Sequence, residues 1–289
     1  MRKLAISVSG GGALGIGPLA FMCRLEEDMG KSLSVLSQAF AGTSTGSIIA
    51  GALDEGMSAH DIHKLYRDNL KAIFTKYPWY KRCMPKCPTY DNSNLKKLLK
   101  ANFSGRVCDW KKPIYIPTTF MNGDSVEKVW DLGDTVSKDF AILTSTAAPT
   151  YFDVIVKDGQ SMCDGGMWKN NCVDVLNAGL KHSGWKRDSY KILSFNTGMD
   201  TPNTECGNQT LLGWGEYLLT NWIAYSGKSG DYEVKADIGD ANLFRASPKS
   251  EKKFKMDDVS EKTLNQVEKI WTDYYETVRT KIWEFMNGI

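Results

Sequence analysis

The sequence predicts an α/β fold in which helices pack against a sheet of mixed, largely parallel strands. Short apolar runs of strand length alternate with segments of helical periodicity along most of the chain, a pattern typical of this class. Two strand-to-helix junctions carry glycine-rich turns, and we expect a site at the carboxyl ends of the strands they follow. No repeat or linker divides the sequence, so 1–289 is predicted to be a single domain with a helical and irregular insertion near 58–108.

The first junction joins a predicted strand at 4–8 to a predicted helix at 18–29, whose first turn contains a proline. Backbone N–H groups of such a turn, aided by the helix dipole, converge on one anionic group, either a phosphate or an oxyanion. A dinucleotide site would need an acidic residue about 20 residues further on, and 33–41 contains neither Asp nor Glu. The oxyanion interpretation is therefore favoured. The glycines of this turn are Gly10, Gly11, Gly12 and Gly15.

The second junction is Gly42-Thr43-Ser44-Thr45-Gly46, between a short apolar run and a helix that carries no charge until Asp54. This pattern predicts a nucleophile elbow, a strained turn that presents the Ser44 hydroxyl above the sheet while Gly42 and Gly46 avoid clashes. The alternative is a serine that only caps the helix. The neighbouring glycine turn favours the nucleophile.

A serine nucleophile needs a base, and the chain contains three histidines. His60 and His63 follow a predicted capping box of Ser58 and Asp61, and without further metal ligands in view they are expected on a solvated helix face. His182 is expected at a helix end, where a cation complements the helix dipole. A Ser-Asp-His triad through His182 stays open as an alternative.

The third motif, Asp164-Gly165-Gly166, places a carboxylate on a glycine turn after a short apolar run. A carboxylate can accept the serine proton directly when it is held close and partly desolvated. We therefore expect a dyad of Ser44 and Asp164, supported by Gly165 and Gly166. A plain Asp-Gly turn is the alternative.

In this order the three motifs resemble those of the patatin-like phospholipases, which carry a GGGx[RK]G oxyanion motif, a G-x-S-x-G elbow and a D-G-[GA] motif. Further similarity lies at 113–123, 145–152 and 242–245. The resemblance implies a three-layer α/β/α sandwich with a central, mostly parallel sheet, and a dyad of Ser44 and Asp164. The chain departs from the pattern at Leu14, where many members have Arg or Lys.

The resemblance also implies a serine lipid acyl hydrolase that cleaves fatty acyl esters of phospholipids or glycerolipids through an acyl-enzyme, with no metal or other cofactor. Alternatives are an acyltransferase or thioesterase using the same dyad, or an inactive phosphate-binding or regulatory module. Expected partners are the lipid, a membrane surface contacted peripherally, and a second copy of the chain or an activating partner or signal. An activated effector that degrades membranes is one such arrangement.

Composition limits the remaining classes of function. A formal net charge of +2 gives no signal for nucleic-acid binding. Seven scattered cysteines without framework spacing predict reduced thiols. The charged start of the chain does not resemble a signal peptide, and no apolar run reaches the length of a membrane span. We therefore expect a cytoplasmic enzyme with peripheral membrane association.

Three further stretches bear on substrate and assembly. Residues 76–86 interleave aromatic and basic side chains, which suits a lipid headgroup boundary, with a loop packed on the body as the alternative. Residues 211–225 are apolar and aromatic and are expected either in the core or lining an acyl-chain channel. The apolar stripe of a final helix at 259–285 is expected to pack on the sheet or on another subunit.

Overall fold

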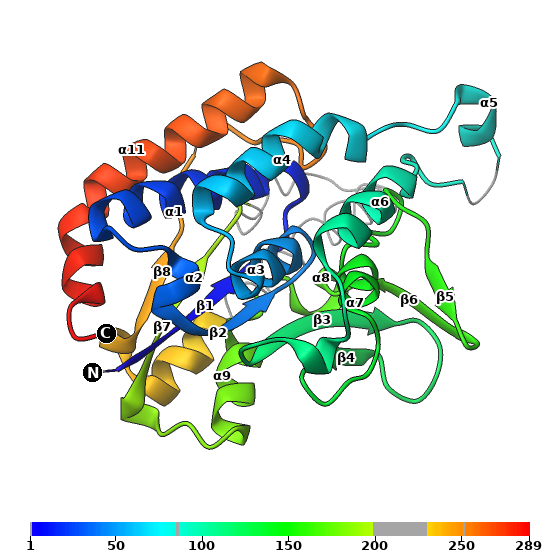
Figure 1. Cartoon of the computed structure of the whole chain (residues 1–289). Coiled ribbons are helices and arrows are strands. Elements are labelled where there is room, and N and C mark those ends of the chain that lie inside the picture. Colours follow the sequence, from blue (N-terminus) through cyan, green and yellow to red (C-terminus); the bar gives the residue numbers. More distant parts are fainter. Residues whose placement is uncertain (1, 85–86, 199–229, 251) are drawn as a thin grey trace, which may run out of the picture.

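A computed structural model describes residues 2–84, 87–198, 230–250 and 252–289. Its centre is a mixed sheet with the strand order β5-β6-β3-β2-β1-β7-β8, and β4 pairs with β3 (Figure 1). Strands β3, β2, β1, β7 and β8 run parallel, whereas β4 and β6 run antiparallel to β3 and β5 antiparallel to β6. The strands are β1 (Lys3–Val8), β2 (Ser37–Gly42), β3 (Ile114–Phe120), β4 (Glu127–Trp130), β5 (Ile155–Lys157), β6 (Gln160–Asp164), β7 (Tyr190–Phe195) and β8 (Leu243–Ala246).

Helices cover both faces of the sheet and give the three layers that were predicted (Figure 1). Helices α1, α3, α4, α6, α7 and α11 pack in the larger core, and α9 with the helical residues 230–238 packs in the smaller one. The α-helices are α1 (Ile16–Met29), α2 (Leu33–Leu36), α3 (Thr45–Glu55), α4 (Ala59–Ile73), α5 (Trp79–Arg82), α6 (Ser93–Asn102), α7 (Lys138–Ser145), α8 (Gly166–Lys169), α9 (Val173–His182) and α11 (Glu261–Met286). The 3₁₀ turns are η1 (Gly12–Gly15), η2 (Val107–Asp109), η3 (Arg187–Ser189) and η4 (Asp240–Asn242).

Strand β1 shows why the sheet needs both helical layers. Leu4, Ile6 and Val8 point into the larger core, and the intervening Ala5 points into the smaller one. All four side chains are fully buried. Alternate residues of a strand face opposite sides of the sheet, so a strand that is apolar on both faces must be covered twice.

Helix α11 packs along α1 inside the same chain (Figure 1). The rings of Trp271 and Tyr275 meet Phe21 of α1 edge-on, with centroid separations of 6.3 Å and 4.9 Å. The apolar stripe of the predicted final helix is therefore covered by α1, and its C-terminal end packs on the sheet as predicted, where the rings of Phe285 and Phe244 of β8 are 5.6 Å apart.

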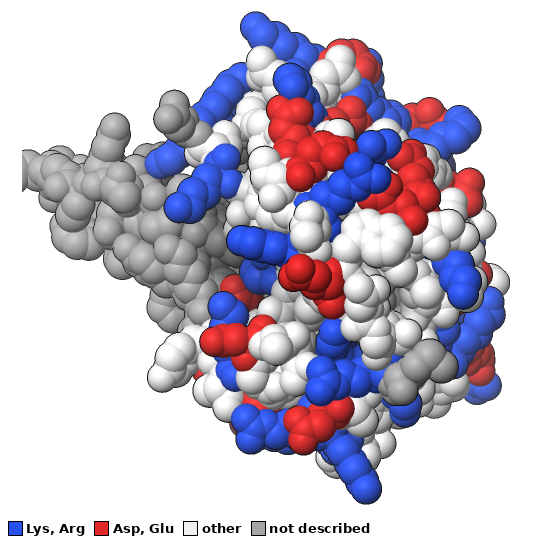
Figure 2. All heavy atoms as spheres, turned by 90° about the vertical axis from the view of Figure 1, so that its left-hand side faces the viewer, with Lys and Arg blue, Asp and Glu red and all other residues white. Residues whose placement is uncertain are grey.

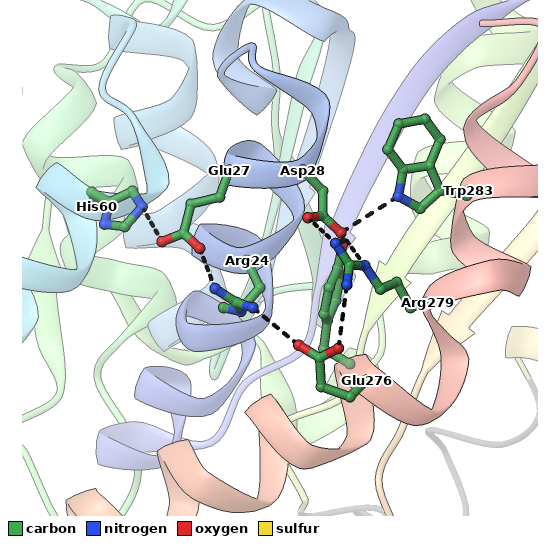
Figure 3. Close-up of polar contacts among 8 residues, drawn as sticks. Arg24, Glu27, Asp28, His60, Glu276, Arg279 and Trp283 are labelled. Carbon is green, nitrogen blue, oxygen red and sulfur yellow. Dashed lines mark hydrogen bonds and ion pairs between the residues drawn. The ribbon is translucent and has the colours of Figure 1, made fainter.

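Polar contacts reinforce the outer side of this helical layer (Figure 3). Arg279 of α11 pairs with both oxygens of Asp28 on α1, at 2.7 Å and 2.6 Å. Arg24 of α1 bridges Glu27 and Glu276.

The face shown in Figure 2 carries Lys and Arg interspersed with Asp and Glu, so the described part of that face has no extended basic surface.

The region predicted as an insertion, 58–108, contains α4, α5, α6 and η2. Its first helix begins with the predicted capping box, since Ser58 accepts from the Asp61 N–H and the Asp61 side chain accepts in return. The apolar stretch at 211–225 lies outside the described residues. Within the described ranges, no helix combines the length and the apolar character needed to cross a membrane.

Candidate active site

Ser44 occupies a sharp turn between β2 and α3. Its φ of 53° and ψ of −124° place a non-glycine residue in a conformation that L-amino acids rarely adopt. Ser44 stands at the N-cap position of α3, yet its side chain makes no capping hydrogen bond. The Ser44 side chain instead lies beside the carboxylate of Asp164, whose pKa it lowers. The serine of this elbow is therefore turned toward an acid and away from the helix end.

Two glycines make the elbow possible, as the sequence predicts. A Cβ at Gly42 would overlap the carbonyl of Gly46, and a Cβ at Gly46 would overlap the carbonyl of Val8. The Thr43 N–H donates to the same Val8 carbonyl at 3.2 Å. The turn therefore lies so close to the end of β1 that only glycine, which has no Cβ, fits at these two positions.

Sheet register brings Asp164 to the level of Ser44. Ala41 of β2 pairs with Tyr115 of β3. Three residues further along β3, Thr118 pairs with Asp164 at the end of β6. Since Ser44 also follows Ala41 by three residues, the serine and the acid reach the same height above the sheet.

Asp164 is a buried carboxylate with few partners. It is 5% exposed, and its Oδ1 accepts the Gly166 N–H at 2.7 Å. Burial raises its pKa to about 6, because the hydrogen bonds from Ser44 and Gly166 offset only part of the cost of desolvating the charged form. Such a group is mostly ionised at neutral pH and is still basic enough to accept a proton.

The first glycine turn lies directly against the elbow. A Cβ at Gly10 would stand 3.0 Å from the Cβ of Ser44, and a Cβ at Gly15 would stand 2.8 Å from the Thr45 hydroxyl. Gly12 has a φ of +57° and faces the carbonyl of Met256, which leaves no room for a side chain. These close contacts explain why glycine is needed at these positions, without a role in binding a nucleotide.

Three backbone donors near Ser44 are free to bind an anion. The N–H groups of Gly11, Gly12 and Thr45 make no hydrogen bond within the part of the chain that the structure describes. The next N–H of the turn, that of Ala13, is occupied by the Met256 carbonyl at 2.8 Å. The sequence pattern pointed to Gly10, Gly11, Gly12 and Gly15, but the Gly10 N–H donates to the Asn170 carbonyl at 3.2 Å and is not free. The pattern did not single out Thr45, although the residue after an elbow nucleophile commonly serves this role.

Ser145 is a second residue that sequence reasoning did not assign to the site. Its Oγ accepts the Ser44 N–H at 3.1 Å and donates to the Pro117 carbonyl at 2.6 Å. It therefore fixes the elbow to β3. Ser145 begins the stretch 145–152, whose similarity to the patatin-like phospholipases gives no role to this serine.

Arg245 of β8 connects the segments that carry the motifs. Its side chain is only 9% exposed. It donates to the hydroxyl of Ser9 at 3.0 Å, to that of Ser194 at 2.7 Å and to the side-chain oxygen of Asn171 at 3.2 Å. The turn that precedes Gly10 is thereby tied to the segment that follows Asp164.

Asn170 leaves an unused donor beside the dyad. The residue is 4% exposed, and its side chain fits between Gly10 and Gly166. Its Nδ2 has no hydrogen-bond partner among the described residues. An unsatisfied buried amide is uncommon, and here it is available to a bound group.

A pocket of about 40 Å³ adjoins Ser44. Its walls are mostly apolar and come from α3, α4, α6 and the segment before β5. The lining residues are Gly12, Ser44, Thr45, Ile48, Tyr66, Leu70, Ile73, Phe74, Leu95, Thr146 and Phe152.

None of the three histidines lines this pocket. His60 and His63 lie on α4, with Nε2 3.3 Å from Glu27 and 2.7 Å from Glu268 respectively. His182 lines a separate cleft of about 740 Å³ between α9 and the strands β3 and β4. The geometry therefore gives no support to a triad through His182.

The chain is similar to several known proteins. A cGAMP-activated phospholipase of Escherichia coli (strain TW11681) is 27% identical over 193 residues, covering 59% of this chain and 53% of that protein. An intracellular phospholipase A2 of Caenorhabditis elegans is 27% identical over 218 residues, covering 67% of this chain and 19% of that protein. The chain thus spans about half the length of the first relative and about a fifth of the second. The structure of VipD from Legionella pneumophila has a TM-score of 0.44 and 13% identity, covering 94% of this chain and 67% of that one.

The sequence model of the family described as patatin-like phospholipase matches residues 6–177. The match covers more than half of the 289 residues and includes both glycine turns, Ser44 and Asp164. The chain belongs to the patatin-like phospholipase family.

Proposed function

We propose that this chain is a serine-dependent lipid acyl hydrolase of the phospholipase A type, acting on fatty acyl esters of phospholipids or glycerolipids. The observation that carries the proposal is the position of the strained Ser44 beside the buried carboxylate of Asp164. Membership of the patatin-like phospholipase family supports the lipid substrate.

In the proposed first half-reaction, the Ser44 Oγ attacks the ester carbonyl carbon while Asp164 accepts its proton. The N–H groups of Gly11, Gly12 and Thr45 stabilise the negative charge that develops on the carbonyl oxygen. The ester C–O bond then breaks, and the leaving alcohol takes the proton from Asp164. An acyl group remains on Ser44.

In the second half-reaction, a water molecule attacks the acyl carbon and transfers a proton to Asp164. The tetrahedral intermediate expels the Ser44 oxygen, which recovers that proton, and the fatty acid leaves. The scheme requires no metal ion or other cofactor, because one carboxylate moves the proton in both directions.

The apolar pocket supports an acyl chain as the group next to the scissile bond. Ile48, Leu70 and Phe74 offer side chains that suit a hydrocarbon. At about 40 Å³ the pocket is far smaller than the roughly 300–1,000 Å³ of typical ligand sites, so its walls must move before a fatty acid can enter.

This small volume favours control of the enzyme by an activating signal or partner. The name of the E. coli relative describes it as activated by cGAMP. We carry over to this chain only the general expectation of an activator, together with peripheral contact with the membrane that holds the substrate. A second copy of the chain is another candidate for the activating partner.

A fluorophosphonate probe and p-nitrophenyl acyl esters test the proposal. The wild-type protein is expected to be labelled at Ser44 and to hydrolyse the ester, whereas Ser44→Ala loses labelling and at least roughly 10³-fold of the rate. Ser125→Ala, a change at an exposed serine, provides the matched control. Equal labelling of Ser44→Ala and the wild type would contradict the mechanism.

The same assay separates the alternatives. An acyltransferase or thioesterase would show itself as faster acyl transfer to an added alcohol than to water, or as a preference for thioesters over oxygen esters. A wild-type protein that is neither labelled nor active, with or without lipid vesicles, would favour an inactive regulatory module.

A further inference from the structure

One exposed segment of the insertion has a composition that the catalytic site does not explain. Residues 76–84, here called the arm, contain α5 and extend away from the body between α4 and α6 (Figure 1). Trp79, Tyr80 and Met84 are 73%, 57% and 62% exposed. Helix α5 buries none of its residues. The arm is thus not a loop packed on the body, and it offers large apolar side chains to the surroundings.

The charges of the arm are all positive. Lys76, Lys81 and Arg82 are exposed, and 76–84 contains no acidic residue. Lys81 lies over the ring of Tyr77, 5.4 Å from its centroid, and none of the three cations forms an ion pair within the described ranges of the chain. Aromatic rings beside exposed cations match the boundary between headgroups and acyl chains in a bilayer, where rings sit at the interface and cations meet phosphates.

The base of the arm is attached to the pocket beside Ser44. Ile73 and Phe74 line that pocket, and only Thr75 separates them from the arm. Within the arm, the hydroxyl of Tyr77 donates to Asp153 at 3.0 Å, and Asp153 follows the pocket residue Phe152. A surface bound by the arm would therefore lie close to the entrance of the apolar pocket.

We propose that the arm docks the protein on bilayers that contain anionic phospholipids, with Trp79 and Tyr80 inserted at the interface and Lys81 and Arg82 facing phosphate groups. The inference rests on the proposed lipid substrate, because docking delivers acyl esters to the pocket. It concerns a binding surface outside the dyad, so the two proposals can fail separately.

Vesicle co-sedimentation tests the docking surface. The full chain is mixed with vesicles of phosphatidylcholine alone or of phosphatidylcholine with phosphatidylserine. We expect the wild type to prefer the anionic vesicles, and both Trp79→Ala/Tyr80→Ala and Lys81→Glu/Arg82→Glu to bind them at least about 10-fold more weakly. Tyr232→Ala removes another exposed aromatic residue, 78% exposed, and should bind as the wild type does.

Hydrolysis of a water-soluble short-chain ester by the same variants separates docking from catalysis. The arm variants should keep wild-type rates on this ester, because no substituted residue lines the pocket. Undiminished vesicle binding by both arm variants overturns the proposal, as does a loss of self-association in size-exclusion chromatography without a loss of vesicle binding. Vesicle binding by a wild-type protein that cleaves no ester and takes up no fluorophosphonate at Ser44, on the vesicles and with the activator present, would leave the arm assigned and would reject the hydrolase.

Discussion

Asp164 and Asp28 are two mostly buried carboxylates whose surroundings differ in the number of hydrogen-bond donors. Asp164 is 5% exposed, accepts one backbone N–H and lies beside the Ser44 side chain. The side chain of Asp28 is 12% exposed and accepts from Arg279, Tyr275 and Trp283 (Figure 3).

The two sites shift the carboxyl pKa in opposite directions. Burial raises the pKa of Asp164 to about 6. The hydrogen bonds from the Arg279 guanidinium are the main cause of a lowered pKa at Asp28. A carboxylate surrounded by donors is stable as an anion and is a poor base, whereas one with few donors keeps its affinity for a proton. Asp28 therefore joins α1 to α11, whereas Asp164 has the surroundings that the proposed role of base requires.

Asp164→Asn is the sharpest test of the comparison. We expect a loss of at least roughly 10³-fold in ester hydrolysis, and a double variant with Ser44→Ala that is no worse than either single one, because the two groups act as a unit. Full activity of a folded Asp164→Asn would remove the base from the mechanism.

The same substitution should stabilise the protein. The folded pKa of Asp164, about 6, lies above its ordinary value of 3.8, so its stabilising contribution is complete below the unfolded pKa and is lost as the pH rises through 6. An amide carries no charge to desolvate. Asp164→Asn should therefore raise the free energy of unfolding at pH 8 by roughly 1–3 kcal/mol, measured by chemical denaturation.

Gly12→Ala tests the oxyanion turn. A methyl group there meets the Met256 carbonyl and requires a left-handed backbone, so the free N–H donors should move and turnover should fall about 10²- to 10³-fold. Gly30→Ala is the matched control, since Gly30 has a φ of +62° but open space around it. Leu14→Met, a change of similar volume at a buried side chain of the same turn, should alter turnover far less. A folded Gly12→Ala protein with normal turnover would limit this glycine to a structural role.

The pH dependence of hydrolysis provides a smaller effect. Because only ionised Asp164 accepts the proton, kcat/KM should fall about tenfold per pH unit below the pKa of about 6. A histidine base would give a similar decrease of kcat/KM in acid, so the pH profile is repeated with His60→Ala, His63→Ala and His182→Ala. Each variant should keep the wild-type rate and the acidic limb of the profile, which is this decrease. Disappearance of the limb in a folded His182→Ala protein would restore the triad.

Asp28→Asn should have the smallest effect. Hydrolysis should stay within about twofold of the wild type, while the loss of a doubly bonded ion pair lowers the free energy of unfolding at pH 7 by roughly 0.5–1.5 kcal/mol. The lowered folded pKa of Asp28 means that its contribution is complete above the unfolded pKa and declines as the pH falls through the folded value. The stability difference between variant and wild type should therefore narrow in acid. A large loss of activity would erase the distinction between the two carboxylates.

The sequence by itself determined the features whose causes are local. Gly42 and Gly46 predict the elbow, because a turn this tight leaves no room for a Cβ at either position. The capping box at Ser58 and the apolar stripe of α11 depend on residues three and four apart along one helix. For these features the residues that interact are neighbours in the sequence, so the pattern alone predicts them.

Only the tertiary structure decided how the site is assembled and where it is exposed. Asp164 reaches Ser44 on a strand antiparallel to β3, and this register depends on pairing between distant segments. The same holds for the contact of Ser145 with the elbow and for the exposure of Trp79 on the arm. The raised pKa of Asp164 follows from burial, which many packed residues create together and no short motif encodes, because desolvation depends on the whole surroundings of the group.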